Sequence, residues 1–460
     1  MLHITPQKIV IIGAGVSGLA AAHHLVRHLA IKKEALCILE AAHAPGGLLR
    51  STYQGNSFWD HGVFVFPKSG FLPGLFPDLF SPIKDMVLNV LINGQIVRHP
   101  PSPTFLFRQH RLSMIFTTLT LPYYFLRYKS GYFEQTLDRW LCNRLTRSCM
   151  RLLQFDIYLK KLQGLSLQRL SASFGEDRLD FLRHPYSFRS IRKQIIQPWK
   201  ASKKEKQNSE NCAAKSVYPA TTGVGEISRR LAGLCMEAGV KINYGSKVVS
   251  IRPLENTRLK ITTSDSKRIQ TLQTSNIIST MPIDKLVTAY QGHLSLPRAE
   301  ILRHLSYRDL LLLFLTVKKT NIPNKHFILY SFDERHKWKR LVAIERRSGF
   351  TDIVIEITLD KNESVNTAFM LSETERQLTE ELALFEKALI VTRLSKRVSG
   401  AYSIYTLGFE KILKTATSDF HKVGIFPAGQ TGIYKTLSTG QSAASGINAA
   451  DNLVAKLKIK

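Results

Sequence analysis

The glycine pattern between Lys8 and Gly18 constrains the fold of this chain more than any other feature. A short apolar run, Ile9–Ile12, predicts a buried parallel strand, and it stops at glycines spaced G-x-G-x-x-G. Gly13 permits the tight turn, Gly15 lets a pyrophosphate approach the backbone, and Gly18 lets a helix pack closely on the strand. We therefore expect a strand–turn–helix unit that binds a dinucleotide.

The residues after these glycines support this interpretation. A helical pattern begins at Val16 and Ser17, whose free N–H groups would face a diphosphate. A second apolar strand, Leu36–Leu39, ends in Glu40, about where a ribose-binding acid belongs. A carboxylate accepts hydrogen bonds from ribose hydroxyls and repels phosphate, so Glu40 favours NAD or FAD over a 2′-phosphorylated cofactor. A glycine-rich turn in some other α/β protein is the plain alternative.

Two further segments favour FAD. Residues 44–51 read Ala-Pro-Gly-Gly-Leu-Leu-Arg-Ser, and residues 60–66 read Asp-His-Gly-Val-Phe-Val-Phe. With the first glycine motif they resemble the N-terminal signature of the flavin amine oxidase and protoporphyrinogen oxidase superfamily, which includes UDP-galactopyranose mutase-like proteins. The resemblance implies FAD as the cofactor and implies that one loop lies along the flavin and pyrophosphate. The loop residues are Gly46, Gly47, Leu48 and Arg50.

The resemblance continues along most of the chain. Residues 218–225 look like the family's return into the FAD-binding domain, and Val248 or Val249 is then the residue whose backbone meets the adenine. Where the family tends to carry a histidine, this chain has Phe64. Any role of that histidine is therefore absent or moved.

The C-terminal part resembles the family's last strand, turn and helix. Residues 424–430 match the strand and turn, which would place Gly429 and Gln430 at the flavin. Residues 445–450 match the final helix, whose N-terminal dipole would favour negative charge on reduced flavin. The family usually has an acid or arginine where Gln430 stands, so the polar contact implied there is weakened.

These segments imply an α/β protein in which a Rossmann-type FAD-binding domain is interleaved with an α+β substrate domain. We expect residues 1–70, 215–290 and 420–460 to form the FAD-binding domain, and residues 71–214 and 291–419 to form the substrate domain. The first substrate segment is mostly helical in pattern. Four apolar runs predict strands of a substrate-domain sheet: 310–317, 327–332, 341–345 and 353–359.

The charge of the chain limits its partners. It has 64 Lys and Arg against 35 Asp and Glu, a formal net charge of +29. The basic residues form no recognised nucleic-acid-binding module, so we expect no nucleic-acid partner. An anionic small-molecule substrate or a membrane surface would suit the charge, and a proteome rich in Lys and Arg is the bland alternative. The apolar, arginine-flanked segment 112–128 is typical of interfacial membrane segments, or of a helix pair covering a core.

Other features favour a cytoplasmic enzyme without a metal. The five cysteines are scattered without C-x-x-C spacing, and the 14 histidines show no metal-ligand spacing, so we predict no metal site. Residues 1–7, which precede the first strand, are too few and too polar for a secretory signal. No run reaches the ~20 apolar residues of a spanning helix. Peripheral attachment to the inner face of a membrane remains an alternative location.

The resemblance implies an oxidoreductase in which a substrate C–H or C–N centre passes hydride to the flavin. A redox-neutral rearrangement of a nucleotide sugar is the alternative, because residues 401–405 resemble an Ala-Tyr-Pro-x-Tyr run of sugar-nucleotide relatives, with serine in place of proline. A non-catalytic scaffold stabilised by FAD is a third class. We predict Lys435, close after the flavin-binding turn, and Tyr402 and Tyr405, on the substrate face, as the catalytic residues.

Three further residues are candidates for contact with substrate. Asn93-Gly94 predicts a hairpin turn, and this hairpin would order Arg98 towards the substrate. His61 and His99 are the acid–base candidates. A structural role is the alternative for each.

Overall fold

The computed structural model describes residues 9–83, 86–99, 134–179, 216–255, 258–265 and 268–459, and the single residues 101, 105, 111, 115, 119, 120, 123, 126 and 182. The predicted interfacial segment 112–128 lies mostly outside the described residues, so membrane attachment through it stays a prediction. No helix among the described residues is long and apolar enough to cross a membrane.

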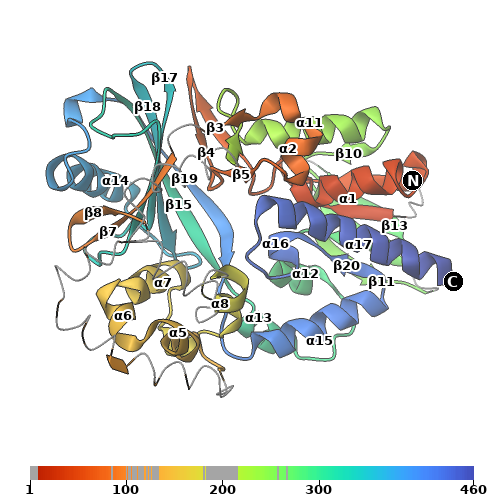
Figure 1. Ribbon diagram of the computed structural model, residues 1–460. Coiled ribbons are helices and arrows are strands. Elements are labelled where there is room, and N and C mark those ends of the chain that lie inside the picture. The colour runs from red at the N-terminus through yellow and green to blue at the C-terminus, as the bar shows by residue number, and fades with distance from the viewer. Residues whose placement is uncertain are drawn as a thin grey trace.

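A five-stranded parallel sheet, in the order β10-β2-β1-β14-β20, forms the centre of the predicted FAD-binding domain (Figure 1). Its strands are β1 (Ile9–Ile12), β2 (Leu36–Leu39), β10 (Lys241–Asn243), β14 (Asn276–Ser279) and β20 (Ile425–Pro427). Strands β1, β2 and β14 are buried along their whole length because both faces of a parallel sheet are covered. The five strands fall inside the chain ranges predicted for this domain, and the predicted α/β class is confirmed.

Helices cover one face of this sheet and a second sheet covers the other. Ile9 and Ile11 pack with the helices of the first face, and Val10 and Ile12 pack on the opposite face. The helices are α1 (Val16–Arg27), α11 (Gly225–Glu237) and α17 (Thr439–Ile459). The opposite face is covered by the antiparallel strands β11 (Lys247–Pro253), β12 (Leu259–Ser264) and β13 (Ile269–Thr274), and by α12 (Ile283–Ala289) and α15 (Phe409–Lys422).

The predicted substrate domain contains a seven-stranded sheet in the order β19-β15-β18-β17-β16-β7-β8. All neighbouring strands are antiparallel except the parallel pair β16 and β7. The strands are β7 (Met86–Ile92), β8 (Gln95–Arg98), β15 (Tyr307–Lys318), β16 (His326–Ser331), β17 (Arg340–Arg347), β18 (Phe350–Leu359) and β19 (Ile390–Ser403). Strands β15 to β18 lie at the four runs predicted from the sequence.

Side chains alternate between the two faces of this large sheet. Leu311, Leu313 and Leu315 point to the face beneath α14 (Thr367–Arg376), away from the FAD-binding domain (Figure 1). Leu312 and Phe314 point the other way and join the apolar cluster that continues into the FAD-binding domain. This second face, called here the inner face, is therefore the one on which a site shared by both domains can form.

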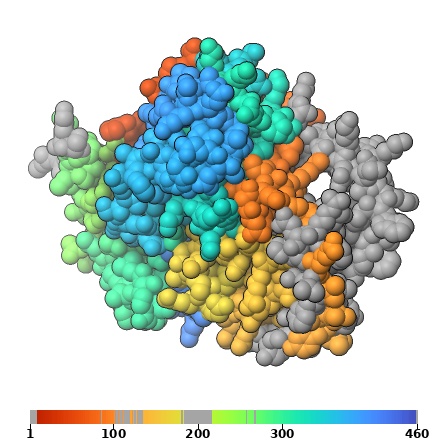
Figure 2. Space-filling model, turned by 90° about the vertical axis from the view of Figure 1, so that its left-hand side faces the viewer, coloured from red at the N-terminus to blue at the C-terminus, as the bar shows by residue number. Residues whose placement is uncertain are grey.

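Short helices complete the described part of the substrate domain, and two small sheets connect it to the FAD-binding domain. The helical part of the substrate domain contains α5 (Leu137–Leu145), α6 (Arg147–Leu152), α7 (Phe155–Gln163) and α8 (Ser173–Arg178), which Figure 2 shows beside the large sheet. Two small sheets lie between the domains: β3 (Ser51–Gln54) with β4 (Ser57–Asp60), and β9 (Ser216–Tyr218) between β5 (Phe66–Pro67) and β6 (Ser81–Pro82). The indole of Trp59 donates to the carbonyl of Leu315 at 2.9 Å, which fixes β4 on β15.

The hairpin predicted at Asn93-Gly94 is confirmed. Strands β7 and β8 pair through Ile92 and Gln95, and Asn93 and Gly94 have φ values of 51° and 77°. Two successive positive φ values are the geometry of a type I′ turn, which Asn-Gly adopts readily. Arg98, at the end of β8, is exposed.

Candidate functional site

The first glycine motif forms a closed turn at the end of β1. Gly13 has a φ of +103°, and its N–H donates to the carbonyl of Leu39 at 2.7 Å, which joins the ends of β1 and β2. A Cβ on Gly18 would collide with the carbonyl oxygen of Gly13. Helix α1 therefore begins directly on the turn, as the spacing predicts, and its first N–H groups point past the sheet edge.

The second glycine loop lies against the first. The N–H of Gly46 donates to the carbonyl of Ala14 at 2.9 Å, and Gly15 and Gly46 form an isolated parallel bridge. A Cβ on Gly47 would lie 3.3 Å from the Cα of Gly15. Two backbones approach here without side chains between them, and this leaves a bare peptide surface along which a diphosphate can lie.

Arg50 binds back to the start of the second glycine loop. One of its guanidinium N–H groups donates to the carbonyl of Ala44 at 3.0 Å, while its Nε is buried and has no acceptor among the described residues. Leu48 is half-buried beside it. A buried donor without a partner is costly, so this Nε has a hydrogen bond to offer to a bound cofactor.

Glu40 stands at the end of β2 and is 8% exposed. Its carboxylate accepts hydrogen bonds from the N–H groups of Ala14, at 2.7 Å, and Ala42, at 2.8 Å. Each carboxylate oxygen has a second lone pair, which suits a ribose hydroxyl. The carbonyl of Glu40 also accepts from the N–H of Ser246, and this bond brings the start of β11 to the same edge of the sheet.

Strand β11 has an irregularity where the adenine contact is predicted. Its pairing with β12 shifts between Val248 and Ser250, so Val249 lies in a β-bulge. Val248 is buried, and Val249 is 44% exposed. The bulge places the backbone of Val249 outside the regular ladder, three residues after Ser246, which is bonded to Glu40.

The turn after β20 is the third glycine-containing segment at this edge of the sheet. The N–H of Gly429 donates to Ser445 Oγ at 3.0 Å, and a Cβ on Gly429 would lie 2.6 Å from Ser17 Oγ. The side chain of Gln430 donates to the carbonyl of Ala401 at 3.0 Å and accepts from the N–H of Leu437 at 3.3 Å. Gln430 therefore fixes this turn to β19, whatever contact it makes with a cofactor.

These residues fit FAD. The structure gathers Gly13, Gly15, Gly18, Gly46, Gly47, Arg50 and Gly429 into one cradle along the carboxyl edge of the parallel sheet, where such folds bind their ligands. Helix α1, beginning at Val16 and Ser17, points its N-terminus into the cradle. When bound, FAD would supply a hydride acceptor. The side of the cradle at Gln430, which is bonded to β19 of the large sheet, is called here the flavin end, and Arg50 lies nearer Glu40, with 3.9 Å between the guanidinium and the carboxylate.

A group of charged side chains, called here the inner cluster, lies on the inner face of the large sheet. It consists of Lys339, Arg340, Glu356 and Tyr402. Lys339 and Arg340 each donate to the Glu356 carboxylate, one to each oxygen. Lys339 Nζ also donates to the hydroxyl of Tyr402 at 3.0 Å, and Arg340 donates to the carbonyl of Gly62 at 2.8 Å.

The inner cluster carries more positive than negative charge. Glu356 is fully buried and Lys339 is 2% exposed. Burial raises the pKa of Glu356, but Arg340 and Lys339 outweigh this effect and hold that pKa below its ordinary value. Burial lowers the pKa of Lys339, yet the Glu356 carboxylate raises it above the ordinary range, so the ammonium stays charged. Two cations thus share one carboxylate.

A second charged group, called here the outer cluster, lies further along the same strands. It consists of Asp60, Tyr218, Arg346 and Asp352. Arg346 donates to Asp60 at 3.2 Å and to the hydroxyl of Tyr218 at 2.7 Å, and its Nε lies 3.5 Å from Asp352. Tyr218 also donates to Asp60. These contacts join β4 and β9 to the large sheet.

The structure separates the three predicted catalytic residues. Tyr402 belongs to the inner cluster. Tyr405 is fully buried, its hydroxyl donates to Asp177 at 3.0 Å, and the same hydroxyl accepts from the N–H of Thr436 at 2.9 Å. Lys435 Nζ lies 3.6 Å from Asp177, and its side chain is 50% exposed. Tyr405 and Lys435 therefore share Asp177 of α8 and stand apart from the inner cluster.

The two histidine candidates differ in their surroundings. His61 is 8% exposed, lies 2.8 Å from Thr52 Oγ1 through its Nε2, and stacks on Phe314 with ring centroids 5.9 Å apart. Burial, together with the charges of Lys396 and Arg50, lowers the pKa of His61 to about 3, so its ring is neutral near pH 7. Burial also lowers the pKa of His99. Neither ring is a proton donor at neutral pH.

Sequence reasoning did not single out Lys339, Arg340 or Glu356. Lys339 and Arg340 end the run His-Lys-Trp-Lys-Arg, which looks like an exposed basic stretch. The available signal was Glu356, the one carboxylate inside the predicted apolar run 353–359. A charge at a core position needs a partner, and a cation in a neighbouring predicted strand is the first place to look.

The fold and the cradle define a FAD-dependent oxidoreductase. The sequence profile described as flavin containing amine oxidoreductase matches residues 16–348. The chain belongs to this family.

Solved structures of several enzymes share the fold. A reduced UDP-galactopyranose mutase has 19% identity and a TM-score of 0.75, over 98% of this chain and 94% of its own. A protein from Exiguobacterium sp. 255-15 named as a protoporphyrinogen oxidase has 16% identity and a TM-score of 0.70, over 98% and 100%. A putrescine oxidase bound to putrescine has 14% identity and a TM-score of 0.65, over 98% and 99%. A search of curated proteins finds no matching sequence.

Proposed function

We propose that the enzyme oxidises a small-molecule substrate by moving hydride from a C–H or C–N centre to FAD. Dioxygen or another electron acceptor then takes the two electrons. The observation that carries this proposal is the meeting of the cradle and the inner face of the large sheet. A substrate that lies on that face is held beside the flavin end of the cradle.

Two chains of hydrogen bonds support this position. On one side the N–H of His61 donates to the carbonyl of Arg50 at 2.9 Å, and the next residue, Gly62, accepts from Arg340. On the other side Gln430 donates to the carbonyl of Ala401, which precedes Tyr402. The inner cluster is thus attached at both sides to segments that form the cradle.

The inner face also excludes water from its deeper part. The rings of Trp59 and Phe314 stack with centroids 5.6 Å apart, and the guanidinium of Arg340 lies 5.1 Å from the ring centroid of Phe64. Apolar walls around a hydride-transfer site strengthen its electrostatic interactions and protect the transferred electrons from side reactions. The chain's contribution is to bind and orient, since the redox chemistry belongs to the cofactor.

A redox-neutral rearrangement of a nucleotide sugar is the second candidate. It is favoured by Tyr402, which stands in the segment that resembles sugar-nucleotide relatives and lies in the inner cluster. One of the similar folds is a UDP-galactopyranose mutase. In such a reaction the flavin would end each cycle in the reduced state in which it began.

Reoxidation of the bound flavin in air separates an oxidase that uses dioxygen from the rearrangement. The holoenzyme would be reduced chemically without oxygen, mixed with air, and followed by its visible spectrum. Rapid return of the oxidised bands supports the oxidase proposal and directs substrate screening to compounds that lose hydride. A reduced state that persists in air for many minutes contradicts an oxidase that uses dioxygen and leaves two reactions, the rearrangement and an oxidation with another electron acceptor. Gly15→Val serves as the control without flavin, because its side chain would fill the bare surface between the two glycine loops.

A further inference from the structure

We infer that the inner cluster binds an anionic group of the substrate, a carboxylate or a phosphate, and that this enzyme therefore disfavours protonated amines. The inference rests on the proposed function only for placing the substrate on the inner face. It departs from the substrate class in the family's description, which is amines.

The charge of the inner cluster is unbalanced. Its two cations share Glu356, and both oxygens of that carboxylate are already occupied, one by Lys339 and one by Arg340. A buried surplus of charge is unfavourable unless a partner neutralises it. An anion would supply the missing charge. An ammonium group would add a third cation to a site whose carboxylate is already engaged.

A further cation lies in the same row across the sheet. Lys396 of β19 is opposite Leu312, Leu312 is opposite Glu356, and Glu356 is opposite Arg340. Directly opposite residues of antiparallel strands project from the same face. Lys396 is exposed and close enough to lower the pKa of the neutral ring of His61. Its charge extends the positive field towards the cradle.

Arg340 retains unused hydrogen-bonding capacity. Its donors to Glu356 and to Gly62 use the same terminal nitrogen, and its Nε is buried without an acceptor among the described residues. The side chain is 16% exposed, so part of the guanidinium faces open space. A guanidinium fork matches the two oxygens of a carboxylate or phosphate.

Aromatic rings lie beside the cations and indicate which kind of group the ligand carries next to its anionic group. Tyr158 of α7 meets Tyr330 edge to face at 5.7 Å and packs on Phe332 at 5.0 Å. Lys339 Nζ lies 4.6 Å from the ring centroid of Tyr402. The three tyrosines are only half-buried. We therefore expect the ligand to carry an apolar or planar part next to its anionic group.

Equilibrium binding to the oxidised holoenzyme tests the inference without any turnover. Perturbation of the visible flavin spectrum would be followed during titration with benzoate, inorganic phosphate, UDP and benzylamine, at constant ionic strength. We expect benzoate or a phosphate-bearing probe to bind and benzylamine to bind at least 10-fold more weakly. Benzoate binding alone would indicate a carboxylate, and binding of UDP or phosphate alone would indicate a phosphate group. Benzylamine binding as tight as that of every anion would overturn the inference.

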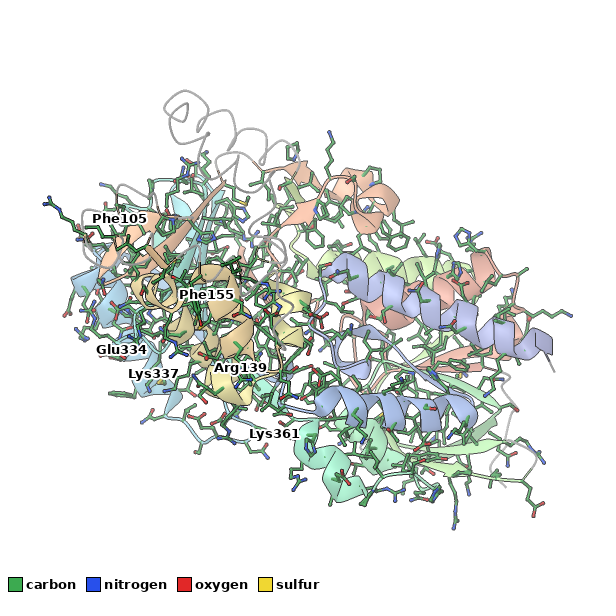
Figure 3. The ribbon with its side chains drawn as sticks, turned by 60° about the horizontal axis from the view of Figure 1, so that its bottom comes forward. Phe105, Arg139, Phe155, Glu334, Lys337 and Lys361 are labelled. Atoms are coloured by element: carbon green, nitrogen blue, oxygen red, sulfur yellow. The ribbon has the colours of Figure 1, made fainter. Side chains whose placement is uncertain are left out.

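Variants locate the site. Arg340→Met should weaken anion binding 10-fold or more, because a hydrogen bond to a charged group is lost. Arg340→Lys keeps the charge without the fork and should fall between the wild type and Arg340→Met, with FAD content confirming that each variant is folded. The matched control is Lys337→Met, since Lys337 is exposed at the side away from α17 (Figure 3). Anion binding that is equal in the wild type and in Arg340→Lys or Arg340→Met would overturn the assignment.

Failure of this inference and failure of the proposed function give different results. Anion binding does not require hydride transfer, so a protein that binds benzoate or UDP but whose reduced flavin persists in air would keep the inference and contradict the oxidase. Rapid reoxidation together with binding of benzylamine alone would support the oxidase and overturn the inference.

Discussion

The inner and outer clusters lie on the same face of β17 and β18, and they carry opposite surpluses of buried charge. In the outer cluster two carboxylates, Asp60 and Asp352, surround one cation, Arg346. In the inner cluster two cations surround one carboxylate, Glu356. The comparison shows that a surplus of charge alone does not indicate a binding site. What matters is whether the protein itself satisfies the surplus.

In the outer cluster the hydrogen-bond donors come from the protein itself, although burial still outweighs them and raises the pKa of Asp60 and of Asp352. The surplus carboxylate charge receives donors from Ser51, Tyr218 and the N–H of Val224 at Asp60, and from Thr316 and the N–H of Phe58 at Asp352. Within the described part of the chain, the inner cluster has only the hydroxyl of Tyr402 and the carbonyl of Gly62 as further acceptors. We therefore interpret the outer cluster as a structural connection between domains and the inner cluster as a site completed by ligand.

The largest effect is expected from Arg346→Met. The substitution leaves Asp60 and Asp352 buried without a cation, and breaking a buried ion pair in this way typically costs about 3–5 kcal/mol. Urea unfolding of the FAD-saturated protein at pH 8 would measure the free energy of unfolding. The control is Arg139→Met, since Arg139 is exposed on α5 (Figure 3). A loss equal to that of the control would show that the outer cluster does not join the domains.

A smaller loss of stability is expected from Arg340→Met. Glu356 keeps Lys339 as its partner, so the variant cluster is balanced. We expect the free energy of unfolding to fall by about 1.5–3 kcal/mol, the contribution of one hydrogen bond to a charged group. The same urea experiment measures it beside Arg346→Met. If both variants lose the same stability, the distinction between a structural and a ligand-completed cluster is wrong.

The cradle could be predicted from the sequence, whereas the two clusters could not. The cradle depends on local spacing, because Gly13, Gly15 and Gly18 act through the backbone within one turn, and its parallel sheet follows from short apolar runs. The clusters depend on the register in which neighbouring strands pair. Arg340 and Glu356 are 16 residues apart, yet they are opposite each other only because β17 and β18 pair in one particular register.

Tyr405 and Lys435 show the same limit. Both were predicted as catalytic from a resemblance and from nearness to the flavin-binding turn. Sequence could not show that Asp177, more than 200 residues before Tyr405, accepts the hydroxyl of Tyr405 and pairs with Lys435. Tyr402 was predicted in the same way and lies in the inner cluster, where its hydroxyl accepts from Lys339.

The peptide between the clusters supplies a pH test. His61 follows Asp60 and precedes Gly62, and burial lowers its pKa from 6.5 to about 3. Between these values the unfolded chain binds a proton that the folded protein does not, so the free energy of unfolding falls as the pH falls through this window. The slope from this residue is at most about 1.4 kcal/mol per pH unit. Urea midpoints between pH 6.5 and pH 4.5 should fall less in His61→Gln than in the wild type. Parallel pH profiles of the two proteins would contradict a buried neutral His61.

The smallest effect on stability is expected from Lys435→Met, which tests a third, exposed ion pair. Lys435 and Asp177 lie 3.6 Å apart with the lysine side chain half-exposed, and such pairs contribute about 0–1 kcal/mol. FAD should stay bound, because the cradle contacts of Gly429 and Gln430 do not involve this side chain. If Lys435 acts near the flavin, flavin reduction by substrate slows while the urea midpoint stays within error of the wild type. Asp177→Asn is the matched variant, since it removes the ion pair but keeps Lys435. Slower reduction in Lys435→Met alone would assign the effect to the lysine, and equal slowing in both would assign it to the connection between α8 and the flavin-binding turn.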